Sequence, residues 1–591
     1  MGRSTRMILM ALAIFFGLAG RAAATTYYVA ANGSDSNNGT SESSPWQHAP
    51  GMPNCTANCA AKTPQPGDSF IFRGGDAWHR SANTNDSSDV AMGGQWTWTW
   101  SGSGLGTTCD YPSATTTCIY LGVDTITPWY NSAVCGSSFC RPQLELDNPI
   151  WAKSTHQDSV HGPGFVTACS YDDYNVRGLN AMAAKGIILD NWNVWGKCWT
   201  QIPNGGGNEL SVSGSADSYN AVVDAYIHGW TETYNPQPNG SAPFDQAAMV
   251  SYVSSPTPTH NTIAHDVFDG SDSCPKALGN TMSNCTGGPV SYGDCFNFFD
   301  NVVRYVANGC NPQYNAVSVH DNLFDEMWES YDPADHGGIM EAANPPNDAV
   351  ASNQYWYNNT VRNSGMGITW EISTLGGYSA YIFNNIFYGL GNGGNCLIID
   401  GTQTPSPNVY ITNNTFDRIA TVDGTACTIR FQANPSPDFN GYVTLQNNDL
   451  IGGFSSPLNS SSNLFNVCSG CSATITDAGN EVFQSEAAAN AEGYTPSDNY
   501  EPPSSGCTSS ANCATYEAGS DLAVDCAIDG TALCSGSTGG AVDAPGTGAL
   551  PVLDILLPTL RAVSWDAGAY QYSGNTAGGP IAPTGLIATV Q

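Results

Sequence analysis

Apolar and polar positions in the second half of the chain repeat one short pattern: an apolar residue, a polar residue, an asparagine, any residue and another apolar residue. The pattern predicts strands of roughly 4 to 6 residues, each closed by a turn. Successive copies lie 21 to 37 residues apart, and a nearly fixed period with insertions of variable length is typical of a solenoid. All copies share one asparagine position, which is occupied by Asn301, Asn322, Asn359, Asn385, Asn414 and Asn448. We expect an earlier member of the same series at Asn261.

The repeated asparagine suits a stack of coils. Asparagine tolerates the left-handed backbone that a tight turn requires, and its amide can bond to the amides above and below it. One such coil buries almost nothing alone, so neighbouring coils must stack and share a core. The pattern therefore predicts an all-β fold, a right-handed parallel β-helix. The alternative is a loop-rich β-sandwich, which would place turn signals about 8 to 12 residues apart.

The two ends of the chain differ from the repeats. Arg3 and Arg6, an apolar run over residues 7–20 and three alanines at 22–24 predict a signal peptide over residues 1–24. We expect a secreted protein, extracellular or periplasmic, with a β-helix and its N-terminal cap over residues 25–497. Residues 498–575 form a segment rich in cysteine, glycine and serine with a final strand, and 576–591 resemble a linker. No later apolar run reaches the length of about 18 residues that spans a membrane.

Twenty cysteines in an exported chain predict disulfides. Several pairs are close enough in sequence to tie loop insertions rather than coils. These pairs are Cys55 with Cys59, Cys109 with Cys118, Cys135 with Cys140, Cys468 with Cys471, and Cys507 with Cys513.

The charge balance narrows the choice of partner. The chain has 17 basic and 51 acidic residues, for a formal net charge of −34. Such a chain is a poor partner for nucleic acid, and its field lowers encounter rates with polyanions. Charge therefore favours a neutral polysaccharide as the partner. We expect the protein to be a monomer. The alternative is that the acidic surface only keeps a secreted protein soluble.

Two N-terminal segments, the asparagine repeat and the closing segment 565–572 together carry a family resemblance. The N-terminal segments are the strand and polar loop of residues 27–40 and the Gly-Asp turn and strand of residues 66–78. With these features the chain resembles the secreted right-handed parallel β-helix proteins of the pectate-lyase-like superfamily. The resemblance implies the fold, and it allows polysaccharide lyases, glycoside hydrolases, epimerases and adhesins. The signatures Asn-Thr-Asp, Gly-Asp-Asp and Gly-His-Gly of polygalacturonase-type hydrolases are absent from the sequence.

Four segments that follow the asparagines predict a second strand in each coil: 337–341, 367–371, 396–400 and 428–432. If they align, Glu341, Glu371 and Asp400 form one outward column with steps of about 4.8 Å. Crowded carboxyls raise the pKa of at least one member, which can then donate a proton. Neighbours about 5 Å apart suit a retaining glycosidase, and members roughly 9.6 Å apart suit an inverting one. A solvated acidic column or a Ca²⁺ site is the alternative.

Further candidate groups surround this column. Asp335 and His336 lead directly into the strand of Glu341, so His336 could share the proton of that carboxyl, although a structural hydrogen bond is the commoner role. Trp328 and Trp370 are expected to bind sugar, and Trp96, Trp98 and Trp100 share one face of a predicted strand. Burial in the core explains a tryptophan equally well.

The lyase alternative depends on arginines. Arg304, Asp325 and Arg362 each stand three residues after a repeat asparagine, so alignment would stack them as cation, anion and cation. The arginines would then bind a uronate. Alternatively, the three residues form a purely structural ladder of ion pairs. The preferred prediction is a glycoside hydrolase for which the sequence requires no cofactor. The alternatives are a Ca²⁺-assisted lyase of a uronate polymer and a non-catalytic surface protein.

Overall fold

The computed structural model describes the two ends of the solenoid and the strands and turns of its coils. The described residues are 24–80, 90–124, 126–145, 179–181, 183–195, 198–199, 210–213, 219–228, 231–232, 249–251, 260–269, 290–291, 297–304, 318–327, 353–364, 368–372, 379–390, 395–401, 408–418, 428–432, 441–452, 465–467, 474–498, 500, 541–542, 552–553 and 569.

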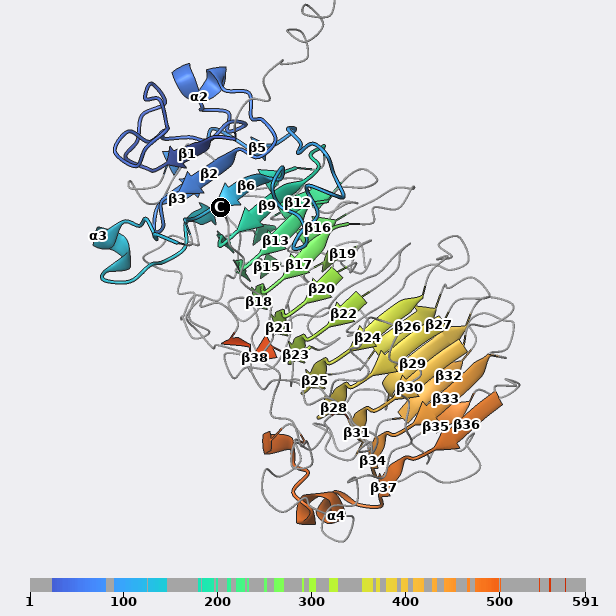
Figure 1. Cartoon of the computed structure of the whole chain (residues 1–591). Coiled ribbons are helices and arrows are strands. Elements are labelled where there is room, and N and C mark those ends of the chain that lie inside the picture. Colours follow the sequence, from blue (N-terminus) through green and yellow to red (C-terminus); the bar gives the residue numbers. More distant parts are fainter. Residues whose placement is uncertain are drawn as a thin grey trace, which may run out of the picture.

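Two long sheets, each of 13 parallel strands, run side by side along the molecule (Figure 1). The first sheet contains β1 (Thr26–Val29), β2 (Ser69–Phe72), β6 (Ile119–Gly122), β9 (Ile187–Asp190), β13 (Ala221–Val223), β17 (Thr262–Ala264), β20 (Asn297–Phe299), β22 (Ser318–His320), β24 (Gln354–Tyr357), β27 (Ser379–Phe383), β30 (Asn408–Thr412), β33 (Tyr442–Gln446) and β36 (Thr474–Ala478). The second contains β4 (Val90–Ala91), β3 (Ala77–His79), β7 (Gln143–Glu145), β10 (Asn193–Trp195), β14 (Tyr226–His228), β18 (Val267–Asp269), β21 (Val302–Arg304), β23 (Leu323–Asp325), β25 (Thr360–Arg362), β28 (Ile386–Tyr388), β31 (Thr415–Asp417), β34 (Asp449–Ile451) and β37 (Glu481–Phe483).

Shorter parallel sheets complete the coils on a third face. One has five strands: β5 (Trp96–Thr97), β8 (Leu179–Asn180), β12 (Leu210–Ser213), β16 (Met249–Ser251) and β19 (Val290–Ser291). Another has four: β26 (Ile368–Ile372), β29 (Asn395–Gly401), β32 (Thr428–Gln432) and β35 (Phe465–Val467). Two small pairs are β11 (Cys198–Trp199) with β15 (Thr231–Glu232), and β38 (Ala541–Val542) with β39 (Val552–Leu553). The helical segments are α2 (Ala57–Ala61), α3 (Ser132–Cys135), α4 (Glu486–Ala491) and the 3₁₀ turn η3 (Pro496–Asp498).

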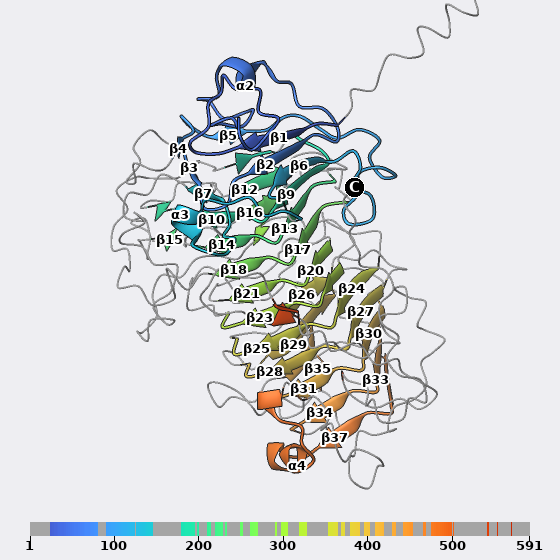
Figure 2. The ribbon, with the colours of Figure 1, turned by 60° about the vertical axis from the view of Figure 1, so that its left-hand side comes forward.

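Each coil contributes one strand to the first sheet, turns sharply into the second sheet and returns by the third face. The strands of consecutive coils pair in parallel, as β20 does with β22 and β21 with β23. The predicted right-handed parallel β-helix is therefore the observed fold, in the hand that parallel crossovers adopt. Figure 2 shows α2 at one end of the stack and α4 at the other.

Three of the predicted local disulfides are present and they tie insertions, as expected. They join Cys55 to Cys59, Cys109 to Cys118 and Cys135 to Cys140. The other two predicted pairs lie outside the described residues. In the part of the chain that the structure describes, no helix has the length and apolar character needed to cross a membrane.

The repeat asparagines form a buried ladder of side chains between the first two sheets. The Oδ1 atom of Asn322 accepts hydrogen bonds from the backbone N and the Nδ2 of Asn301, at 2.9 and 3.1 Å. The Nδ2 of Asn322 donates to Phe298 O and to Asn359 Oδ1. Every side-chain hydrogen-bonding atom is thereby used, and the pattern repeats as far as Asn448.

The structure corrects three details of the predicted ladder. Asn261 is not a member, because the backbone N of Asp266 donates to Asn301 Oδ1 and Asp266 thus holds the preceding position. Asn480, which the sequence pattern missed, accepts from Asn448 and continues the ladder. The left-handed residue is the one before each ladder asparagine, such as Asn358 with φ of 55°.

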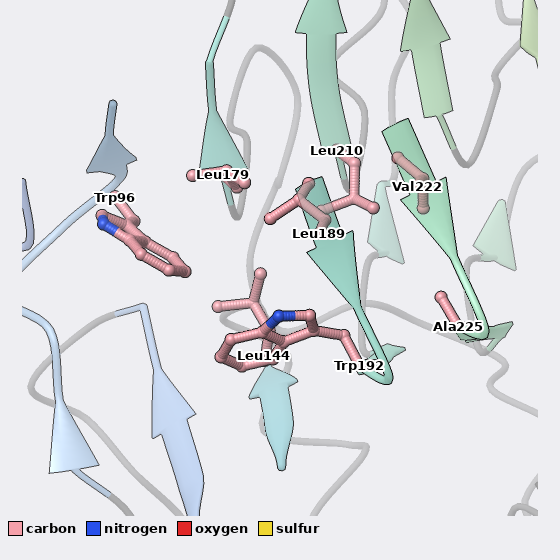
Figure 3. A pocket seen from close by; sticks show the side chains of 8 residues that line it. All are labelled: Trp96, Leu144, Leu179, Leu189, Trp192, Leu210, Val222 and Ala225. Carbon is pink, nitrogen blue, oxygen red and sulfur yellow. The ribbon is translucent and has the colours of Figure 1, made fainter. Parts of the chain in front are cut away.

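The core lies inside the coils, where the central residue of each strand points. Its aromatic side chains stack from coil to coil, as in the run from Phe298 through Phe324 to Trp356. Near the N-terminal end, a small interior cavity separates the three faces (Figure 3). Apolar side chains line it: Trp96, Leu144, Leu179, Leu189, Trp192, Leu210, Val222 and Ala225. A sugar site needs convergent polar groups, so this cavity is a packing gap and not a substrate site.

Truncation of one ladder member, Asn359→Ala, is expected to lower the free energy of unfolding by at least about 3 kcal/mol. The change leaves Val319 O and the two amide groups of Asn322 without their partner, and a buried unsatisfied group costs about 1–3 kcal/mol. Urea unfolding followed by circular dichroism measures the loss. Thr476→Ala, at an exposed strand position, is the control and should stay within about 0.5 kcal/mol of the wild type. Equal stabilities of the two variants would contradict a stabilising role of the ladder.

Asp266 occupies a ladder position that elsewhere holds asparagine. Its Oδ1 accepts from the backbone N of Ala225 at 2.7 Å, whereas its Oδ2 is buried and, among the described residues, has no hydrogen-bond partner. Burial raises the pKa of Asp266 well above its usual range. The folded protein therefore retains a proton that the unfolded chain releases above about pH 4, so this residue lowers stability as the pH rises.

Asp266→Asn should accordingly raise the free energy of unfolding at pH 7, and should raise it less at pH 4. The amide supplies the donor that the ladder uses in every later coil and removes the cost of ionisation. Urea titrations at the two pH values test this. Glu42→Gln, which removes one charge from an exposed side chain, is the control. The explanation fails if Asp266→Asn gives the same stability change at both pH values or none.

Candidate active site

The sharp turn between the first and second sheets contains one left-handed residue per coil. In the later coils this position holds asparagine, at Asn358, Asn384, Asn413 and Asn447. In four earlier coils it holds a titratable residue, at Asp224, His265, Asp300 and Asp321. Asparagine, aspartate and histidine tolerate this backbone better than other side chains do. The turn therefore lines up ionisable groups along the outside of the helix at the spacing of its coils.

Asp190, Asp224, His265 and Asp300 form a continuous group, which we call the acid ridge. Asp190 ends β9, and the pairing of β9 with β13 places Asp224 in the next coil. His265 and Asp300 follow β17 and β20 in the next two coils. Interstrand spacing sets steps of about 4.8 Å between the backbone positions of Asp224, His265 and Asp300, whereas Asp190 lies in register with Val223, one residue before Asp224.

The carboxyl groups of Asp190 and Asp224 are hydrogen-bonded to each other. Burial, and then the charge of Asp224, raise the pKa of Asp190 to about 7. Burial also raises the pKa of Asp224. Asn191 Nδ2 donates to Asp190 Oδ1 at 2.9 Å, and the Tyr120 hydroxyl donates to Asp190 Oδ2. These contacts hold a carboxyl pair that retains one proton into the neutral range.

His265 connects this pair to a third carboxylate. Its Nε2 lies 3.3 Å from Asp300 Oδ2, and its Nδ1 lies 3.9 Å from Asp224 Oδ1. Burial lowers the pKa of His265. The hydrogen bond and charge of Asp300, together with the charge of Asp224, raise it by more, so the net pKa is above its ordinary value. About a third of the imidazole and 29% of the Asp224 side chain are exposed. The ridge is therefore open to a ligand.

Arg141 binds the backbone of the ridge at Asp224. Its Nε donates to the backbone O of Asp224 at 3.0 Å. Burial lowers the pKa of Arg141, while the charges of Asp224, Asp266 and Asp190 act in the opposite direction. The charge of His265 first, and then that of Arg141, favour the ionised form of Asp224 by lowering its pKa against the effect of burial, so the shared proton resides mainly on Asp190.

His320 and Asp321 lie one coil beyond Asp300. The His320 ring is sandwiched between Phe299 and Tyr357, with ring centroids 5.0 and 4.6 Å away, and its Nδ1 lies 2.7 Å from Asp321 Oδ2. Asn358 Nδ2 also donates to Asp321. These contacts make the pair part of the scaffold.

The alignment of the predicted acidic column is confirmed in part. Glu371 in β26 lies opposite Asp400 in β29, and Asp400 lies opposite Gln432 in β32. The other predicted column member, Glu341, lies outside the described residues, as do Asp335, His336 and Trp328. Trp370 lies in β26 opposite Ile399. The catalytic role of Glu371 and Asp400 and the substrate role of Trp370 stay predictions.

The predicted stack of Arg304, Asp325 and Arg362 is also confirmed in its register. Arg362 forms an ion pair with Asp325 at 2.8 Å, and Arg304 forms one with Asp269, in the preceding coil, at 2.6 Å. Arg304 is only 3% exposed. The predicted ladder of ion pairs is thus present in part, since Arg362 pairs with Asp325 but Arg304 pairs with Asp269. Substrate binding by either arginine, still a prediction, would require its pair to open.

Two of the three alternating tryptophans are core residues. Trp96 and Trp98 are fully buried, so they are not a sugar platform. As for metal, no group of three His, Cys, Asp or Glu among the described residues is arranged to hold an ion.

The acid ridge was missed from the sequence for a definable reason. The ladder pattern ends upstream of Asn301, because Asp266, Ala225 and Trp192 occupy the equivalent positions in earlier coils. Counting one position back from each ladder residue would have found Asp300, but Asp224 and His265 become visible only once those substitutes are recognised.

Comparison with known proteins gives structural likeness only. No family model matches the chain, and no curated protein matches it. A GH136 lacto-N-biosidase from Eubacterium ramulus is 12% identical with a TM-score of 0.35, over 78% of this chain and 68% of that one. Pectate lyase Pel9A is 12% identical with a TM-score of 0.25, over 93% of this chain and 96% of that one. At these values the likeness carries no argument about the reaction.

Removal of the Asp300 charge should lower the pKa of His265. In Asp300→Asn the side chain still suits the left-handed turn, so the fold is retained while the anion that holds the imidazolium is lost. Because the folded pKa of His265 is raised, its ion pair stabilises the protein below about pH 6.5, and this stability is lost as the pH rises through the folded pKa. NMR titration of the His265 ring measures the shift. An unchanged titration would show that Asp300 does not control this histidine.

Proposed function

We propose that this chain is a secreted glycoside hydrolase that cleaves an extracellular polysaccharide at the acid ridge. One observation carries the proposal: Asp190 and Asp224 form a hydrogen-bonded carboxyl pair beside a partly open surface, and the pKa of Asp190 is raised to about 7. Cleavage of a glycosidic bond requires a carboxylic acid that is still protonated at the working pH and a carboxylate that acts on the other side of the sugar.

The proton donor is the Asp190–Asp224 pair. Asp190 is 6% exposed, so its proton reaches the substrate through the more exposed Asp224. Transfer to the glycosidic oxygen breaks the bond to the anomeric carbon, and the pair is left as two carboxylates. Arg141 and the Tyr120 hydroxyl stabilise that doubly charged state.

Asp300 is the general base. It stands two coils beyond Asp224, a backbone separation of about 9.6 Å from two interstrand steps. Inverting glycosidases separate acid and base by roughly 6.5–9.5 Å, which leaves room for the attacking water. The contact with His265 orients the Asp300 carboxylate. The reaction is therefore expected to invert the anomeric configuration.

The direction of the ridge sets the direction of the substrate. Acid and base lie two coils apart along the helix axis, so the sugar chain runs along that axis with the scissile bond over His265. A uronate polymer would meet a row of acids on a chain with a net charge of −34, which favours a neutral polymer. The lyase alternative is less well supplied, because Arg304 and Arg362 are engaged in ion pairs.

Glu371 and Asp400 are the second candidate pair for the same reaction. The pairing of β26 with β29 places them at opposite backbone positions in adjacent coils, and a separation near 5 Å would suit a retaining enzyme. The stereochemistry of the product distinguishes this pair from the ridge.

Asp224→Asn and Asp300→Asn are each expected to lower kcat by about 10²–10⁴ on the polysaccharide that the wild type cleaves, because general acid or base catalysis contributes that factor. Reducing ends released from neutral polysaccharides measure activity, and NMR of the first product gives its anomer. Asp321→Asn is the matched control: it changes the same turn position one coil away and should retain activity.

Other outcomes would replace the proposal. Full activity in both ridge variants, with loss in Glu371→Gln and Asp400→Asn, would move catalysis to the four-stranded sheet. A product absorbing in the ultraviolet as an unsaturated uronate would identify a lyase. Absence of cleavage across the panel would favour the non-catalytic surface protein.

A further inference from the structure

A disulfide-tied loop from the N-terminal part of the chain lies beside the acid ridge. The loop, residues 105–118, is closed by the bond between Cys109 and Cys118 and by short bridges from Leu105 to Cys109 and from Asp110 to Ala114. It leaves the coils before β6, yet its contacts reach coils that follow more than a hundred residues later. The ridge residues by themselves do not explain why this loop extends so far along the solenoid.

The loop packs on the outer face of the first sheet. Both of its cysteines are buried in an apolar cluster with four outward residues of the sheet, and Leu105, Tyr111 and Tyr120 cover the edge of this cluster. The four sheet residues are Ile188, Ala221, Val223 and Ala264. Val223 and Ala264 immediately precede Asp224 and His265. The loop therefore ends where the ridge begins.

Polar contacts fix the loop to the coil that contains β17. Thr262 Oγ1 donates to Tyr111 O at 3.3 Å. His260 Nδ1 lies 3.4 Å from Asp110 Oδ2, and the His260 ring stacks on Tyr219 with centroids 4.2 Å apart. With the disulfide, these contacts hold the loop as a rigid wall.

The Tyr111 side chain packs against the same cluster, whose members Val223 and Ala264 adjoin Asp224 and His265 of the ridge. Burial first, and then the charges of Asp224, Asp190, Asp266 and Asp300, raise the pKa of its phenol. All four carboxyl groups belong to the ridge or lie directly behind it. The hydroxyl therefore keeps its proton throughout the working pH range and can act as a hydrogen-bond donor there.

We propose that the loop of residues 105–118 is one wall of the substrate site and that the Tyr111 hydroxyl donates a hydrogen bond to the sugar bound next to Asp224. The inference rests on the proposed function and adds a specificity residue to it. The ligand group is a hydroxyl or ring oxygen of a neutral pyranose, because a carboxylate-bearing sugar would lie against the acids. Tyr111 takes no part in proton transfer and acts by positioning the substrate.

Binding to a catalytically silent protein tests this inference without relying on turnover. In the Asp224→Asn background, neutral cello-, xylo-, manno- and laminari-hexaoses are titrated by calorimetry. Tyr111→Phe is expected to raise the dissociation constant of the tightest hexaose by up to about tenfold, the effect of one neutral hydrogen bond. In the active protein the same change should raise KM by a similar factor, with little effect on kcat or on the pH profile.

The disulfide gives a second variant and the chain offers its control. Cys109→Ser with Cys118→Ser should weaken binding of the same hexaose, since the wall loses its closure. Cys55→Ser with Cys59→Ser opens another short disulfide loop, beside α2, and should leave binding unchanged. Thermal unfolding is measured for each protein. If the Cys109 variant unfolds, Tyr111→Phe decides alone.

Failure of the inference differs from failure of the proposed function. Unchanged hexaose binding in Tyr111→Phe overturns the role of the loop, while loss of cleavage in Asp224→Asn would still uphold the ridge. Absence of binding by any of the hexaoses to the Asp224→Asn protein also overturns the inference. Equal weakening by the Cys55 and Cys109 variants would show a general effect of disulfide loss and would likewise count against it.

Discussion

The buried asparagine ladder is the interaction on which the rest of the structure depends. Each amide accepts two hydrogen bonds from the coil before it and donates two others, so no polar atom of the side chain is left unpaired in the core. An unpaired amide there would cost more than its bonds contribute, so the ladder is nearly all-or-none along its length. It holds the turns of successive coils in register, and all outward columns inherit that register.

The same turn that builds the ladder also creates the candidate active site. The residue before each ladder position is left-handed, which confines the choice to asparagine, aspartate, histidine and glycine. Three of these four carry polar groups, so a scaffold that uses asparagine in its later coils can place acids and a histidine in its earlier coils without changing the backbone. Coil spacing then brings Asp190 and Asp224 so close that both cannot ionise freely.

Function and stability compete where ladder and ridge meet. Asp266 holds the first ladder position in place of an asparagine, directly behind the ridge, and burial raises its pKa. A neutral Asp266 adds no negative charge behind the proton-sharing pair. Arg304 and Arg362 differ from Asp266, because each of these buried or half-buried charges is paired with an aspartate of the neighbouring coil. Departures from the repeat thus concentrate at the ridge.

The sequence by itself determined the features that each coil encodes locally. One pattern of spacing predicts the six asparagines and the registers of Glu371 with Asp400 and of Arg304 with Asp325, because a hydrogen-bonded turn recurs in every coil. The short disulfides follow separately from cysteines that are close in sequence. Asn261 was wrongly placed because asparagine also serves at the start of the first-sheet strands, where Asn261 accepts from Asn220. Only the tertiary structure brought Asp190, Asp224, His265 and Asp300 together and laid Tyr111 beside them. Their pKa shifts depend on burial and on contacts between distant segments, which no local pattern of residues records.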